Sequence, residues 1–405
     1  MASTEKSKIR LFMRQESTRR TFGYYLLFSS MGMDIGILGP LLPSLAQQTQ
    51  VSLAQIGLVF LAGSVGYLIG TTFAGQIFDH IRGHPALGYA QILVAGCVAL
   101  IPLVPWFWVL FLLEILKGIA QGTVNNGSNT LLVWTHGARV GPYMNGLHFT
   151  FGLGAFLSPI LVAQALRFGL GYQWVFWVLA VFMGVAGLRV LTLGESPKPA
   201  NQAGQTLEDG KQRTSLKPIL PFILVTALFL FFYVGAELGY AGWLYTYAIT
   251  LDLTDPARAA YLNSAFWLSF TIGRLLSVVW ATRFNPGKII PLSLAGALVS
   301  LLPALILPSS LSALWISTIG AGFCMAPIFP SGVTLAGQSV QLTARITGLI
   351  FLGDSLGGMV LPSLLGKVIE SAGPRMMMFL VFASLCLNGL TFTRMVKPFQ
   401  TDVRK

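Results

Sequence analysis

Four carboxylates lie in the middle of long apolar stretches of this sequence, where acidic side chains are rare. They are Asp34, Glu114, Glu237 and Asp354. A charged group deep in a bilayer is costly, so acids in such stretches usually pair with another group or face a cavity. This chemistry suits a cation or solute pathway. We expect Asp34, Asp354 and Glu237 to take part in cation coupling, with a purely structural pairing as the alternative for Asp34.

Glu237 has aromatic neighbours that favour a sugar site. On a helix, Tyr233 and Tyr240 lie about one turn on either side of it on the same face, and Trp243 follows. A carboxylate accepts hydrogen bonds from hydroxyl groups, and an aromatic ring packs on the C–H face of a sugar. We therefore expect Glu237, Tyr240 and Trp243 to contact a solute. An aromatic belt at the membrane surface is the alternative for the rings.

A second group of polar side chains follows one helical face between residues 114 and 129. Glu114 and Lys117 are three residues apart and can neutralise each other, which favours a structural pair. Gln121, Asn125 and Asn129 follow at four-residue spacing and form one polar stripe. Because amides are costly against lipid, we expect this stripe to face the solute.

Two further side chains in the apolar stretches, Arg274 and His148, need polar surroundings. An arginine stays protonated in proteins, so Arg274 must pair, and Glu237 and Asp354 are the candidates. Arg274 could form a structural clamp between helices or contact the solute, and both roles remain alternatives. Asp354 could couple to a cation or only neutralise Arg274. We expect His148 to form hydrogen bonds in a cavity, with a proton relay as the alternative.

Twelve apolar stretches must position these residues. A bilayer-spanning helix needs about 20 mostly apolar residues. Hydrophobic residues make up 54% of the chain and charged residues only 10%, which leaves no polar coat for a soluble domain. The stretches are too continuously apolar for the strands of a membrane barrel. We predict helices at 21–46, 53–78, 86–104, 106–134, 143–166, 173–193, 219–249, 260–282, 287–307, 311–338, 346–370 and 375–395.

The net charge of +12 comes from basic residues in short loops and tails, without the aromatic-interleaved patch of a nucleic-acid surface. We therefore expect no nucleic-acid partner. With an even number of helices, both termini lie on one side, and most basic residues gather there. The opposite side holds only Arg167, Arg258, Lys367 and Arg375. The positive-inside rule then predicts that both termini lie in the cytoplasm. We expect a multi-pass protein of the plasma (inner) membrane.

The chain divides near its middle. Residues 194–218 are polar and rich in Pro, Gly and Gln, which predicts a cytoplasmic linker between a half at 1–193 and a half at 219–405. The segment beginning Gly146-Leu147-His148-Phe149 is echoed by the one beginning Gly348-Leu349-Ile350-Phe351. The fold class we predict is an all-α membrane protein with 12 transmembrane helices in two pseudo-symmetric six-helix halves.

The loop after the second stretch carries a resemblance to a known family. The segment from Gly75 through Asp79 and Arg82 to His84 resembles the signature loop of the major facilitator superfamily. The resemblance implies the 6+6 fold and a cytoplasmic latch in which Asp79 and Arg82 take part.

A narrower resemblance runs through four segments. Gly39-Pro40-Leu41-Leu42-Pro43, the stretch 145–159, the stretch 233–243 around Glu237, and the stretch 266–274 look like the branch that holds fucose–proton symporters and sodium-dependent glucose transporter-like proteins. This resemblance implies sugar transport, and it adds Trp267 to the expected solute contacts.

The function we expect is alternating-access transport of a small hydroxylated solute, with a sugar preferred, coupled to H⁺ or Na⁺. The alternatives are a proton-coupled exporter of drugs or other amphipathic compounds and a lipid transporter. The sequence has no Gly-x-x-x-x-Gly-Lys phosphate loop and no metal or nucleophile constellation, so we expect no cofactor beyond the coupling ion and no enzyme activity. We expect a monomer in the lipid bilayer.

Overall fold

The computed structural model describes residues 2–80, 83–197, 218–340 and 343–396, without the side chains of 2–14, 75–80 and 344. In these ranges the chain is helical and has no strand. The first half contains α1 (Ala2–Thr49), α2 (Leu53–Ile56), α3 (Leu58–His80), α4 (Gly83–Leu100), α5 (Phe107–His136), α6 (Val140–Arg167) and α7 (Gln173–Leu191). The second half contains α8 (Leu220–Thr250), α9 (Pro256–Ala281), α10 (Pro286–Ile306), α11 (Leu311–Met325), α12 (Ile328–Ser339), α13 (Ala344–Ala372) and α14 (Met376–Val396).

These helices correspond to the predicted spans. Within the described ranges, 11 segments are long and apolar enough to cross a membrane, and one of them, Phe107–Arg167, is 61 residues long. That segment contains both α5 and α6, separated by a turn at Gly137, whose φ of 53° favours glycine. Helices α11 and α12 together form one span that is interrupted at Pro327. The arrangement is consistent with twelve crossings and confirms the predicted fold class.

The two halves show related packing. Inside the first half α1 lies against α6 and α3 against α5, while inside the second half α8 lies against α13. Between the halves, α6 contacts α9 and α3 contacts α13. The fifth helix of each half therefore meets the second helix of the other, as expected for two repeats related by a pseudo-two-fold axis.

Small residues allow the close helix contacts. On α3, Gly66 and Gly70 lie directly against the α5 backbone at Ile115 and Ile119, so a side chain at either glycine would collide with a carbonyl group. Lipid provides no hydrophobic force between helices, so helix pairs in membranes are stabilised largely by the van der Waals packing that such close approach allows. The contact between α3 and α5 positions Tyr67 and the polar stripe that are described below.

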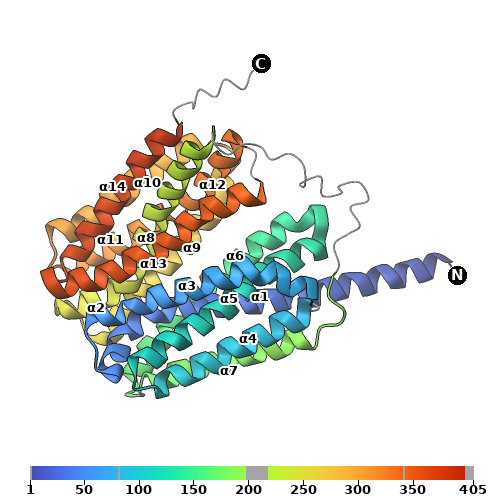
Figure 1. Ribbon diagram of the computed structural model, residues 1–405, viewed down its shortest axis with the longest axis horizontal. Coiled ribbons are helices and arrows are strands. Elements are labelled where there is room, and N and C mark those ends of the chain that lie inside the picture. Colours follow the sequence, from blue (N-terminus) through green and yellow to red (C-terminus); the bar gives the residue numbers. More distant parts are fainter. Residues whose placement is uncertain (1, 81–82, 198–217, 341–342, 397–405) are drawn as a thin grey trace.

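The halves are joined at the end of the bundle opposite the chain termini, which we call the distal end. Figure 1 shows them close together near α2 and splayed apart toward the end where the chain enters and leaves. Hydrogen bonds link described residues of the two halves near the distal end. They join the backbone N–H of Ala54 to Glu370 (2.7 Å), Gln164 to the hydroxyl of Tyr261 (2.7 Å) and Ser363 to the carbonyl of Gly57 (3.1 Å).

Parts of two predictions lie outside the described residues. Of the predicted linker, residues 198–217 are not described, and neither are the side chain of Asp79 and the whole of Arg82. The linker and the latch therefore stay predictions.

Candidate functional site

A buried charge cluster occupies the interior of the first half. The ammonium group of Lys117 on α5 lies 3.0 Å from a carboxylate oxygen of Asp34 on α1 and 3.0 Å from one of Glu114. These side chains are buried, with exposed fractions of 8% for Asp34, 3% for Glu114 and 4% for Lys117. The predicted Glu114–Lys117 contact is present, but Lys117 serves two acids. With all three groups ionised, the cluster holds one more negative charge than positive.

The amide stripe of α5 extends from this cluster toward the C-terminal end of the helix. Gln121 donates a hydrogen bond from its Nε2 to Asp34 (2.9 Å), and Asn125 donates one to the hydroxyl of Tyr67 on α3 (2.6 Å). Asn129 donates to the backbone carbonyl of Asn125 (2.8 Å). All three amide side chains are half-buried. The stripe thus has one end on the charge cluster and its middle on a tyrosine hydroxyl.

A second set of charges lies in the other half, on three helices. Glu237 of α8, Arg274 of α9 and Asp354 of α13 are all half-buried. Arg274 acts electrostatically on Glu237, and Glu237 acts on Asp354, although no ion pair within 4 Å joins them among the described residues. The guanidinium of Arg274 instead lies 4.7 Å from the centre of the Phe270 ring. Its Nε is buried and has no hydrogen-bond partner in the described part of the chain.

Two residues of the first half lie within electrostatic range of these charged residues of the second half. Tyr67 lies within electrostatic range of Asp354, and His148 of α6 lies within range of Arg274. The His148 side chain is exposed, and its ring meets Phe28 edge-on at 5.7 Å. The structure therefore brings together groups from both halves: Asn125, Tyr67 and His148 on one side, and Glu237, Arg274 and Asp354 on the other. We call these six residues the central site.

Tyr67 is a member of the central site that the sequence interpretation missed. A signal was present, because this tyrosine stands among Gly63, Gly66 and Gly70 in an otherwise apolar helix. A tyrosine hydroxyl within a protein interior normally finds a hydrogen-bond partner. Neither the partner nor the direction of the side chain follows from that pattern alone.

Three aromatic residues that we expected to contact the solute are buried and pack inside the protein. Tyr240 is fully buried, and its hydroxyl bonds to Thr318 (2.9 Å), which lies on α11 inside the second half. Trp243 is also fully buried and donates its Nε1–H to the carbonyl of Pro362 (2.8 Å). Trp267 is 1% exposed and lies edge-on to Phe270 at 5.6 Å. The structure does not support these three as solute contacts in this conformation.

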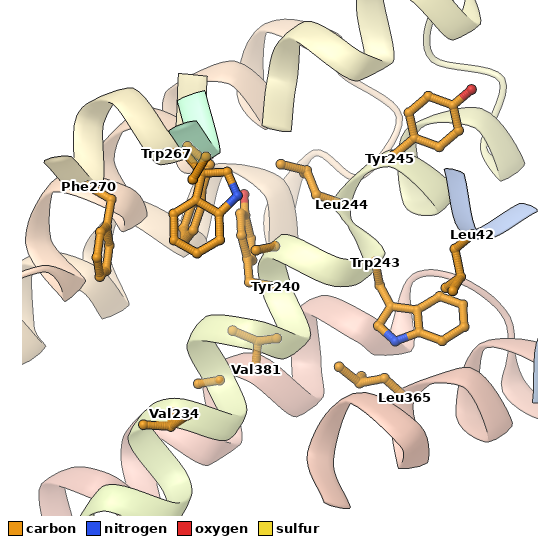
Figure 2. Packing of buried hydrophobic residues seen from close by; sticks show 14 of the residues in the cluster. Leu42, Val234, Tyr240, Trp243, Leu244, Tyr245, Trp267, Phe270, Leu365 and Val381 are labelled. Carbon is orange, nitrogen blue, oxygen red and sulfur yellow. The ribbon is translucent and has the colours of Figure 1, made fainter. Parts of the chain in front are cut away.

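Figure 2 shows where these rings lie instead. Trp243 stands between Leu42 of α1 and Leu365 of α13, so it belongs to the contact between the halves at the distal end. Its ring also lies 6.2 Å from that of Phe60 on α3, and a side chain added at Gly57 would come within 3.2 Å of it. Trp243 therefore helps to hold the distal end closed.

Comparison with known proteins identifies the family of the chain. A family model described as Major Facilitator Superfamily matches residues 24–362 and, in a second match, 254–403. The chain belongs to the major facilitator superfamily. As a member of this superfamily it is an integral multi-pass membrane transporter of small solutes, and its central site lies between the two halves of the fold.

Individual relatives agree with this membership. The chain is 30% identical to the sodium-dependent glucose transporter 1A of Mus musculus, over 92% of this chain and 94% of that protein. Among solved structures, a variant of the nucleoside transporter NupG superposes with a TM-score of 0.76 at 16% identity, covering 94% of this chain and 100% of that one. A D-xylose–proton symporter superposes with a TM-score of 0.75 at 15% identity, covering 94% and 98%. The structural matches support the fold.

Proposed function

We propose that this superfamily member is a cation-coupled symporter of a small hydroxylated solute, with a hexose as the leading candidate. The observation that carries the proposal is the central site, where polar and charged groups of the two halves lie within electrostatic range of one another. The similarity to a sodium-dependent glucose transporter over almost the whole chain supports the choice of a sugar.

The groups of the central site suit a ligand rich in hydroxyls. Glu237 and Asp354 accept hydrogen bonds, while Asn125 and Tyr67 can both donate and accept. Arg274 is half-buried, and its guanidinium group offers further donors.

The charge cluster is the candidate for cation coupling. Two carboxylates share the single ammonium group of Lys117 in a buried setting, and an excess buried charge is expensive. A proton or Na⁺ at Asp34 would remove that excess, and the contact of Asp34 with Gln121 connects this event to the amide stripe. Asp354 is the second candidate, since it lies within electrostatic range of another acid, Glu237, and Arg274 acts on Glu237.

Transport would proceed by alternating access around the central site. With both termini in the cytoplasm, the closed distal end faces outward and the splayed end faces inward. The halves would rock about the site, breaking the distal contacts of Trp243, Ser363 and Glu370 when the protein opens outward.

Uptake by proteoliposomes containing the purified protein tests the proposal. Radiolabelled D-glucose, D-xylose, L-fucose, a nucleoside and a cationic dye are supplied while Na⁺ and pH gradients are imposed separately. We expect accumulation of at least one sugar above equilibrium, driven by one of the two gradients. Accumulation of the nucleoside or the dye without any sugar would refute the proposal, as would sugar equilibration that neither gradient affects.

A further inference from the structure

We propose that Gln121 is the positioning residue that communicates the charge of Asp34 to the bound solute, by rotation of its side-chain amide. This inference rests on the proposed cation coupling and adds the physical link between the cation and the solute. In this view the contact of Gln121 with Asp34 is not a permanent structural one, because the amide reorients with the charge of Asp34.

The orientation of the Gln121 amide follows from the chemistry of its partner. An ionised carboxylate only accepts hydrogen bonds, so the amide nitrogen must point toward Asp34. The structure shows that contact, with 2.9 Å between Nε2 of Gln121 and a carboxylate oxygen of Asp34. The amide oxygen Oε1 then points away from the acid. While Asp34 is negative, Gln121 therefore offers an acceptor on its other side.

Gln121 lies next to the central site along α5. Gln121 is half-buried, and it stands one helical turn before Asn125 on the same face of α5. Asn125 contacts the hydroxyl of Tyr67, which is within electrostatic range of Asp354 in the opposite half. Gln121 consequently occupies the position between the buried charge cluster and the groups proposed to bind solute.

Neutralisation of Asp34 reverses the preference of the amide. A protonated carboxyl group gains an O–H donor, which the amide oxygen of Gln121 can accept. A Na⁺ ion beside Asp34 has the same effect, because this hard cation takes oxygen ligands. In either case the amide turns over and its NH₂ group points toward the solute. A solute hydroxyl that donates its proton to a carboxylate of the central site can only accept at this place, so it is bound by the donor of the cation-loaded state and repelled by the acceptor of the empty state.

The other charged neighbours of Asp34 cannot transmit the change in this way. Lys117 is a donor in both states and is held by Glu114 as well. Among the described residues, the thiol of Cys97 on α4 also lies within electrostatic range of Asp34, but it faces the same cluster and is not part of the amide stripe. Among these neighbours, Gln121 alone belongs to the amide stripe.

The test compares D-glucose binding by the purified full-length protein with and without Na⁺, and at pH 5.5 and 7.5, by isothermal titration calorimetry. Coupling between two sites typically changes an affinity by about 5- to 150-fold, and we expect the parent protein to lie in that range for one cation. Gln121→Met keeps the length of the side chain without its hydrogen bonds. We expect it to bind D-glucose with an affinity that changes less than about twofold with the cation.

Gln91→Met is the matched control. The amide of Gln91 also bonds to α1, through Ser30 at 2.9 Å, but it does not touch the charge cluster. This variant should keep the cation dependence of the parent. Gln121→Asn, which retains an amide too short to serve both neighbours, provides a second test if Gln121→Met does not elute as a monodisperse protein. We expect it to lose the dependence as well.

The outcomes separate this inference from the proposed function. If the parent binds D-glucose in a cation-dependent manner and the folded Gln121 variants keep that dependence, the amide switch is refuted while the symporter proposal stands. If the parent binds no sugar of the uptake panel, or binds without cation dependence, the symporter proposal itself is refuted, and the inference with it. Loss of the dependence in Gln91→Met as well would also refute a specific role for Gln121.

Discussion

Replacement of Lys117 by methionine should destabilise the protein far more than replacement of either acid by its amide. Lys117 contacts both Asp34 and Glu114 at 3.0 Å, and all three side chains are less than a tenth exposed. At an effective dielectric constant of about 20, two unit charges roughly 4 Å apart attract by about 4 kcal/mol. Lys117→Met removes this attraction for two acids at once and leaves both buried without a cation.

The expected loss is about 3–5 kcal/mol of unfolding free energy, the usual cost of removing one partner from a buried ion pair. Glu114→Gln should cost much less, because it leaves a neutral Asp34–Lys117 pair and removes the excess negative charge. The double variant Lys117→Met/Glu114→Gln retains one unpaired acid, so it should be more stable than Lys117→Met alone. Because protonation neutralises unpaired acids, the penalty of Lys117→Met should also shrink as the pH falls.

Equilibrium unfolding of the purified variants in mixed detergent micelles, followed by circular dichroism, measures these differences. Gln91→Met serves as a control for a buried polar substitution outside the cluster. The reasoning is refuted if Lys117→Met is as stable as Glu114→Gln, or if the double variant is less stable than both single variants. Either result would mean that the three charges do not act as one unit.

Three further predictions concern transport. Glu237→Gln should weaken D-glucose binding by roughly tenfold or more, since hydrogen bonds to a charged group contribute about 1.5–3 kcal/mol. Unchanged calorimetric binding by the folded variant would exclude Glu237 from the site. Asp34→Asn should abolish gradient-driven accumulation in proteoliposomes while equilibrium exchange persists, because the amide imitates a single charge state; uphill transport by this variant would move the coupling role to Asp354. Tyr67→Phe should raise the dissociation constant for D-glucose about fivefold, the effect of one hydrogen bond of about 1 kcal/mol, whereas an unaltered constant would show that Tyr67 serves only helix packing.

The membrane architecture could be predicted from the sequence, because its determinants are local. The thickness of the hydrocarbon layer sets the length of each apolar stretch, and every backbone group in that layer must be satisfied within a helix. Each predicted stretch accordingly coincides with a helix or helix pair to within a few residues, except that α1 begins at Ala2, well before the predicted residue 21. The buried acids were recognisable for the same reason, since a charge within an apolar stretch stands out.

The partners of those charges could not be predicted, because they depend on how distant helices rotate against one another. Lys117 lies 83 residues from Asp34 along the chain, yet it forms an ion pair with Asp34 as well as with its local neighbour Glu114. Helix α8 shows the limit most clearly. Its residues are apolar on all sides, so the period of the pattern does not reveal which face meets the cavity. Contacts with Thr318 and Pro362 turn Tyr240 and Trp243 into the protein, and only tertiary packing leaves Glu237 beside Arg274 at the junction of the halves.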